Sequence, residues 1–97
     1  MIIVTGRITA RADGFDDLRT AALAHVVRSR TEPGCISHGV AVDCEAPLDL
    51  VFFERWADAE TLEIHLRHPG SAEFMTVIRR HAASTVGPDL YPVADGK

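Results

Sequence analysis

The opening segment of the chain is rich in β-branched residues and predicts a strand over Met1 to Thr9. Apolar residues then recur at helical spacing, at Phe15, Leu18, Ala22 and Val26. Asp13 is expected to cap the start of this helix, with Asp16 favourably placed near its positive end. The sequence Glu32-Pro33-Gly34 is expected to end it.

Two strands are predicted next, separated by a turn over Asp43 to Pro47. In the first, Cys35 to Val42, alternation places Ile36, His38, Val40 and Val42 on one face. In the second, Leu48 to Trp56, one face carries Leu50, Phe52, Glu54 and Trp56, and the other carries Val51, Phe53 and Arg55. Both faces are largely apolar, so helices are expected on one and a second chain on the other.

The remaining sequence predicts two helices and a short strand. Asp58 is expected to cap a helix with Leu62, His65 and Leu66 on one stripe, which Pro69-Gly70 breaks. The next helix carries Phe74, Val77, Ile78 and His81 at i, i+3, i+4 and i+7, so that they share one face. It is expected to end at Gly87-Pro88. Leu90 to Val93 is expected to form the final strand, in which Pro92 requires an edge or terminal position.

This order, β-α-β-β-α-(α)-β, is typical of a ferredoxin-like α+β sandwich with an antiparallel sheet. The 97 residues, of which 46% are hydrophobic, suffice for one domain, expected over residues 1–93 with a loose tail over 94–97. A formal charge of −4 argues against nucleic-acid binding. No 18-residue apolar run and no leader pattern is present, so a cytoplasmic protein is expected, without a membrane partner.

The two cysteines are not expected to form a disulfide. Cys35 and Cys44 are nine residues apart, about 30 Å along one strand, whereas a disulfide needs Cα atoms within about 7 Å. They could pair only if a turn intervened. Both are therefore expected to be reduced.

Several ordered motifs resemble the antibiotic biosynthesis monooxygenase domain. They are Glu32-Pro33-Gly34-Cys35, Phe53-Glu54-Arg55-Trp56, Leu62-Glu63-Ile64-His65-Leu66, Pro69 and Phe74. The resemblance implies a homodimer of ferredoxin-like subunits whose sheets pack together as an α/β barrel. It also implies oxygenation of a quinol, an anthrone-like compound or another enolisable aromatic by O₂ without flavin, haem or metal.

The chain departs from the haem-degrading relatives that it resembles. Those relatives carry an Asn in the first strand and a His ligand on the last helix, where this chain has Gly6 and Ile78. Trp56 does fit their Trp. The resemblance therefore implies a protein that binds haem poorly.

His65 and His38 are the candidate catalytic residues. His65 is either a general base or donor for a phenolic substrate, or a helix-face histidine bonded to a backbone carbonyl. His38 lies among aliphatic residues, so it either faces the pocket or is a core histidine that has found a partner.

The candidate substrate-binding residues lie close to these histidines in the predicted fold. Trp56 and Phe52, joined by Phe74, would form an aromatic wall. Plain core packing is the alternative, and it suits Phe52 better than Trp56, whose N–H needs a partner. Glu54 is either a base with a pKa raised by burial or, as we favour, half of an ion pair with an arginine such as Arg7. Arg55 or Arg7 would hold a substrate oxyanion.

A metal site has little support in the sequence. His65 and His68 have i, i+3 spacing, but no third ligand matches them. Ser37, Ser71 and Ser84 lack the context of a nucleophile. The favoured function is a cofactor-independent monooxygenase; the alternative is a non-enzymatic dimeric module that binds a small ligand or serves a stress response.

Overall fold

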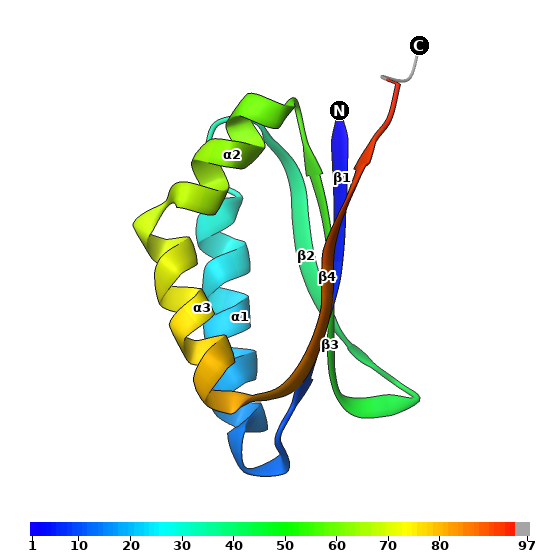
Figure 1. The fold of residues 1–97 in the computed structure, drawn as a ribbon, viewed down its shortest axis with the longest axis vertical. Helices are drawn as coiled ribbons and strands as arrows, with labels where there is room; N and C mark the ends of the chain where they lie inside the picture. Colours follow the sequence, from blue (N-terminus) through cyan, green and yellow to red (C-terminus); the bar gives the residue numbers. More distant parts are fainter. Residues whose placement is uncertain (95–97) are drawn as a thin grey trace.

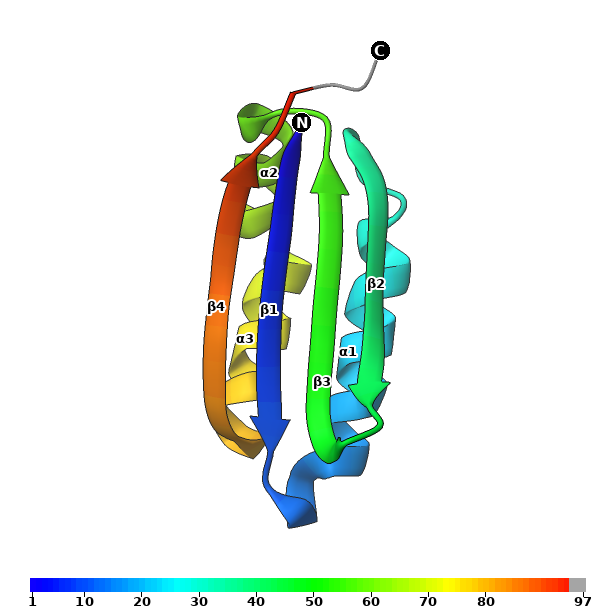
Figure 2. The same cartoon turned by 90° about the vertical axis from the view of Figure 1, so that its right-hand side faces the viewer.

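The computed structural model describes residues 1–94 as a four-stranded sheet with three helices packed on one of its faces (Figures 1 and 2). The elements are β1 (Ile2–Ala10), a 3₁₀ turn η1 (Ala12–Gly14), α1 (Phe15–Ser29), β2 (Cys35–Asp43), β3 (Ala46–Trp56), α2 (Ala59–Arg67), α3 (Pro69–His81) and β4 (Ala82–Pro92). Of the tail expected over residues 94–97, all but Ala94 lies outside the described residues.

The strands are all antiparallel and lie in the order β2-β3-β1-β4, as Figure 2 shows. This arrangement confirms the ferredoxin-like α+β fold expected from the element order. The edge position of β4 accommodates Pro92, which cannot donate to a strand partner. Among the described residues, no helix has both the length and the apolar character needed to cross a membrane.

The alternation predicted for β3 is confirmed. Leu50, Phe52 and Trp56 are buried beneath the helices, whereas Phe53 on the opposite face is 49% exposed. Val4 and Ile8 of β1 are buried on the same side as the β3 residues. The core therefore lies between one sheet face and α1, α2 and α3, and the other face is uncovered by any described residue (Figure 2).

The start of α1 differs from the prediction. Asp13 does not cap this helix, because both of its carboxylate oxygens bond the Arg11 guanidinium at 3.1 Å within the 3₁₀ turn. The residue before α1 is Gly14, which offers no side-chain cap. Asp58, in contrast, caps α2 as expected, accepting a hydrogen bond from the Thr61 amide at 2.8 Å.

The last part of the chain also differs from the prediction. Helix α3 ends at His81, and Gly87-Pro88 lies inside an 11-residue strand instead of ending a helix. These two residues usually mark loops, but an edge strand tolerates them, and the pairing of β4 with β1 shifts register between Thr5 and Arg7.

The predicted face of β2 is interrupted at its start. The register with β3 shifts between Cys35 and Ser37, and Ile36 is 50% exposed instead of sharing the buried face with His38. The turn that follows shortens to Cys44 and Glu45 because β3 begins at Ala46. Cys35 and Cys44 are both free thiols.

Candidate active site

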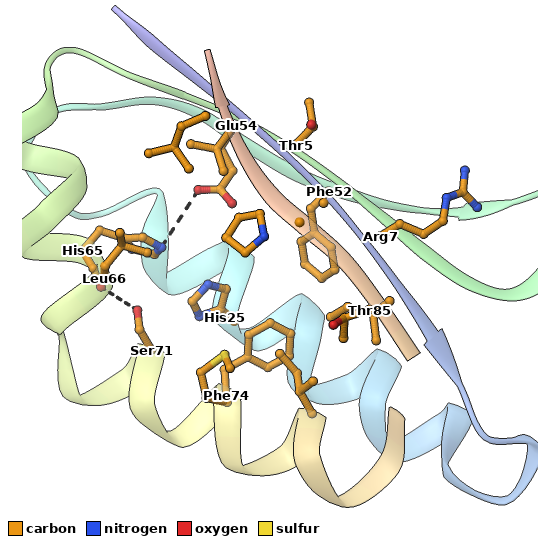
Figure 3. Close-up of a pocket in the computed structure, with 18 of the residues that line it drawn as sticks. Thr5, Arg7, His25, Phe52, Glu54, His65, Leu66, Ser71, Phe74 and Thr85 are labelled. Atoms are coloured by element: carbon orange, nitrogen blue, oxygen red, sulfur yellow. Dashed lines mark hydrogen bonds and ion pairs between the residues drawn. The ribbon is translucent and has the colours of Figure 1, made fainter. Parts of the chain in front are cut away.

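A cavity of about 200 Å³ lies between the helices and the sheet (Figure 3). Its walls are mainly apolar and include Val4, Ile8, Phe52, Leu62, Phe74 and Leu90. Gly6 lies between Val4 and Ile8 on the inward face of β1 and contributes no side chain, which leaves room for this space. Most small-molecule sites are larger, about 300–1,000 Å³, so the cavity suits a small ligand.

Three histidines from three different elements meet at one end of the cavity. His25 comes from α1, His38 from β2 and His65 from α2, and one ring nitrogen of each lies within 4.8 Å of the others. Aromatic rings flank the group: Trp56 lies 4.5 Å from His65 and Phe74 lies 4.5 Å from His25 between ring centroids. The structure thus gathers ionisable side chains that are far apart in the sequence.

Glu54 completes this polar end of the cavity. Its Oε1 accepts a hydrogen bond from Trp56 Nε1 at 2.8 Å, and it lies 3.1 Å from His38 Nε2 and 4.0 Å from His65 Nε2. Burial opposes ionisation, but contact with His38 and the Trp56 hydrogen bond outweigh it, so the pKa of Glu54 is lowered. Both sequence-based interpretations are therefore wrong: its pKa is not raised, and its partner is not an arginine.

His65 is buried but has a charged partner. Its Nδ1 lies 3.1 Å from Glu32 Oε1, so the carboxylate, instead of the backbone carbonyl considered above, orients the ring. Burial lowers the pKa of His65, and the neighbouring Glu32 only partly opposes this effect. At neutral pH the ring is uncharged, and Nε2 lies on the side of Glu54.

His25 lines the cavity as well, although it was not among the residues predicted from the sequence. Arg28 donates to its Nδ1 at 2.8 Å. Burial, together with the neighbouring His65, His38 and Arg28, lowers the pKa of His25 to about 3. The signal available in the sequence was its position, since His25 falls on the buried stripe of α1 with Leu18 and Ala22.

His38 lies behind the cavity rather than in its wall. The residue is 3% exposed, and its ring packs against those of Trp56, His25 and His65. Its Nε2 approaches Glu54 at 3.1 Å in an orientation poor for a hydrogen bond, and Nδ1 has no partner among the described residues. Trp56 occupies a similar place behind the wall, whereas Phe52, Glu54, His65 and Phe74 line the cavity.

Neither arginine expected to hold an oxyanion is available for that role. Arg55 lies on the exposed face of the sheet and donates to Ser37 Oγ at 2.8 Å. Arg7 borders the cavity, but its guanidinium points away from the histidines (Figure 3) and bonds Asp43 at 2.9 Å and Asp49 at 2.7 Å. Alternation along the strands explains both results, since odd-numbered residues of β1 and β3 face away from the helices.

Two hydrogen bonds and one glycine hold His65 in place. Ser71 Oγ donates to the His65 carbonyl at 2.6 Å, which ties the last turn of α2 to the start of α3 (Figure 3). Gly34 has a φ of +82°, and a Cβ there would come within 2.4 Å of Thr61. This turn brings Glu32 beside α2, where it can reach His65.

The three histidines form the one group of side chains in the described range with the proximity expected of a metal site. His65 and His38 each have a ring nitrogen that could bind a cation. His25 does not fit, because the lone pair of its Nδ1 faces a guanidinium and its other nitrogen therefore carries the proton. A metal would have to displace that proton next to a positive charge, so the donor set favours proton transfer over metal binding.

The fold and the cavity together define a small α+β domain with ionisable side chains at the end of an apolar cavity. The chain belongs to the antibiotic biosynthesis monooxygenase family, whose sequence model matches residues 1–77. This match confirms the family resemblance seen in the motifs. Gly6 and Ile78, which stand where haem-degrading relatives carry polar residues, both line the cavity and offer no ligand atom.

Similar proteins agree on the fold. A candidate antibiotic biosynthesis monooxygenase from Deinococcus radiodurans superimposes with a TM-score of 0.93 at 21% identity, over 100% of this chain and 96% of that one. Rv0793 from Mycobacterium tuberculosis superimposes with a TM-score of 0.85 at 21% identity, over 98% of this chain and 96% of that one. The uncharacterized protein sll1783 of Synechocystis is 28% identical over 97% of this chain, which spans 64% of that protein's length.

Proposed function

We propose that the protein is a cofactor-independent monooxygenase acting on a quinol, an anthrone-like compound or another enolisable aromatic. The observation that carries this proposal is the neutral, carboxylate-held His65 at the end of an apolar cavity. Family membership supports oxygenation chemistry. Within this class, the volume of about 200 Å³ favours quinols of one or two rings over three-ring anthrones.

In this reaction His65 acts as the general base. Its Nε2 takes a proton from a hydroxyl or an acidic C–H group of the substrate, and the Glu32 carboxylate stabilises the imidazolium that forms. The apolar walls exclude water, which leaves the substrate anion poorly solvated and ready to give up an electron. Phe52 and Phe74 would hold the ring system by apolar contact.

The substrate anion then reacts with O₂. One electron passes to O₂, and the two radicals combine at carbon to give a peroxide. The proton held by His65 goes to the outer peroxide oxygen. The O–O bond then breaks as the remaining proton of that carbon is removed, so that C=O forms and the outer oxygen leaves as water. Overall, a ring CH₂ group and O₂ give a ring C=O group and H₂O, so O₂ accepts the four electrons that the carbon loses.

We further propose that the protein works as a homodimer. One face of the sheet is uncovered by the described residues, and it carries Phe53 and Tyr91, each 49% exposed. A domain of this size cannot bury both faces of its sheet alone. A second copy packed on this face would produce the barrel that the family resemblance implies.

Oxygen uptake with a panel of quinols and anthrones tests the function. We expect substrate-dependent uptake by the wild type and a loss of about 10²–10⁴-fold in His65→Phe, which keeps much of the ring volume but removes the base. The melting temperature should fall by only a few degrees. His81→Phe is the matched control, because His81 lies at the far end of α3 beside Asp17 and should leave turnover unchanged.

Two results would contradict the proposal. One is unchanged turnover in His65→Phe with a large loss of stability, which would make His65 a structural residue. The other is tight binding of these compounds without oxygen uptake, which would favour the non-enzymatic binding module instead.

A further inference from the structure

An ion pair at the end of α1 touches two of the clustered histidines. Arg28 NH1 donates to Glu32 Oε2, and the pair is largely shielded, with side-chain exposures of 27% and 9%. The second nitrogen of Arg28 donates to His25 Nδ1 at 2.8 Å. The second oxygen of Glu32 lies 3.1 Å from His65 Nδ1. The Arg28–Glu32 ion pair therefore contacts the Nδ1 atom of both His25 and His65.

The chemistry of these partners gives the two rings opposite proton positions. A guanidinium can only donate, so His25 Nδ1 must accept and the ring proton of neutral His25 is on Nε2. An ionised carboxylate can only accept, so His65 Nδ1 must donate and the lone pair of neutral His65 is on Nε2. The lowered pKa values of both histidines support the neutral form of each ring.

The remaining nitrogens are available to a ligand. His25 and His65 both line the cavity, and their ring centroids are 5.2 Å apart. His25 Nε2 has no hydrogen-bond partner among the described residues. It is also not among the side-chain atoms that are both fully buried and without a partner. His65 Nε2 lies 4.0 Å from Glu54 Oε1, beyond hydrogen-bond distance.

We propose that Arg28 and Glu32 are positioning residues that hold His25 and His65 in opposite tautomers, so that the cavity presents one N–H donor and one basic nitrogen. Such a site selects a ligand that carries a hydroxyl proton to give and a second oxygen that accepts a hydrogen bond. This inference rests on the proposed function for its substrate. It also supplies a hydrogen-bond donor inside the cavity, which neither Arg7 nor Arg55 provides.

In the proposed reaction the two rings act together. His65 Nε2 removes the hydroxyl proton, and His25 Nε2–H donates to the second oxygen of the substrate, which holds the ring in place while the anion forms. An uncharged donor suits this role, because it forms a hydrogen bond with the substrate anion without forming an ion pair with it. The same pair of rings would discriminate against aromatics that have a single oxygen.

The tautomers can be measured directly by long-range ¹H–¹⁵N NMR of the labelled protein. We expect a protonated Nε2 in His25 and a protonated Nδ1 in His65. In Glu32→Gln the preference of His65 should weaken or reverse while His25 is unchanged, and in Arg28→Gln the preference of His25 should change. Glu63→Gln and Arg67→Gln are matched controls, since this i,i+4 pair on α2 is exposed and touches no clustered histidine.

The same tautomer in both wild-type rings, or a charged imidazolium in either, would overturn the proposal. So would a Glu32→Gln protein in which His65 keeps its tautomer. If a variant does not fold, the wild-type spectrum alone decides. This readout needs no turnover, so a protein with the expected tautomers and no oxygen uptake would overturn the proposed function and leave this inference standing.

Binding without oxygen tests the selectivity. Under argon, 1,4-dihydroxynaphthalene should bind the wild type about five-fold more tightly than 1-naphthol does, as expected for one additional hydrogen bond. In Arg28→Gln the two affinities should converge, while Arg67→Gln should keep the difference. Equal affinities in the wild type would overturn the proposed selection.

Discussion

Each of the three clustered histidines has a different kind of partner, and that partner determines what its ring can do. Glu32 accepts from His65, Arg28 donates to His25, and His38 has one nitrogen near Glu54 and one without a partner. Three rings of the same residue type thus have three different sets of partners. Their environments, rather than their identity, separate a base from a donor.

The depressed pKa of His25 predicts how stability depends on pH. The unfolded chain binds a proton at His25 near pH 6.5, whereas the folded protein resists protonation until about pH 3. The stability due to this site is therefore complete above about pH 6.5 and falls as the pH is lowered toward 3. The lowered pKa of His65 acts in the same direction.

Urea unfolding between pH 7 and pH 5 measures this effect, because the carboxylates titrate mainly below that window. The free energy of unfolding of the wild type should decrease across it. In His25→Phe, which can keep the stacking on Phe74, the decrease should be smaller. Parallel curves for the two proteins would show that His25 is protonated without cost in the folded state.

At the scale of the elements, short connections place the functional side chains. The turn after α1 brings Glu32 to α2, and Ser71 at the start of α3 binds the last turn of α2. His68 ends α2 and also caps α3, accepting a hydrogen bond from the Gly70 amide at 2.9 Å. The site consequently depends on helix ends as much as on the helices themselves.

Two glycines provide a test of this dependence. Gly34→Ala forces a side chain into a φ of +82° and against Thr61, so we expect a loss of about 1–3 kcal/mol in the free energy of unfolding. The displaced turn should also weaken the contact between Glu32 and His65. Gly39→Ala on β2 is the matched control, because a Cβ there meets nothing within 4 Å.

Chemical denaturation of both variants checks this prediction. Gly39→Ala should be neutral or slightly stabilising, since it restricts the unfolded chain. Equal stability of the two variants would show that the turn relaxes without cost.

At the scale of the whole molecule, one face of the sheet has no layer packed on it among the described residues (Figure 2). We expect light scattering at micromolar concentration to give about twice the 10.6 kDa mass of one chain. The interface should bury more than about 1,200 Å² in total. A mass of one chain would contradict the proposed homodimer.

A pair of charge substitutions locates the interface. Phe53→Glu places a charge on the uncovered face and should yield monomers, because a buried, unpaired carboxylate is costly. Leu23→Glu is the control, since Leu23 is 54% exposed on α1, outside the sheet. Dissociation by Leu23→Glu alone would place the interface on the helices.

The hydrophobic pattern was sufficient to predict most of the architecture. Period-two alternation identified the buried face of β3, and helical spacing identified α1, α2 and α3. It failed for β4, where Gly87 and Pro88 are typical of loops and the strand residues are largely exposed. An edge strand needs little apolar sequence, because its partner strand supplies the pairing.

The sequence by itself determined the fold class and several residues of the cavity wall, since periodicity fixes which side chains face the helices. His65, Glu54, Phe52 and Phe74 were found in this way. Only the tertiary structure decided their electrostatic partners. Glu32 meets His65 because the turn after α1 and the last turn of α2 converge in space, which no local spacing encodes. Arg28 reaches His25 at i,i+3 spacing on α1, but only the structure shows that this pair lies beside the cavity.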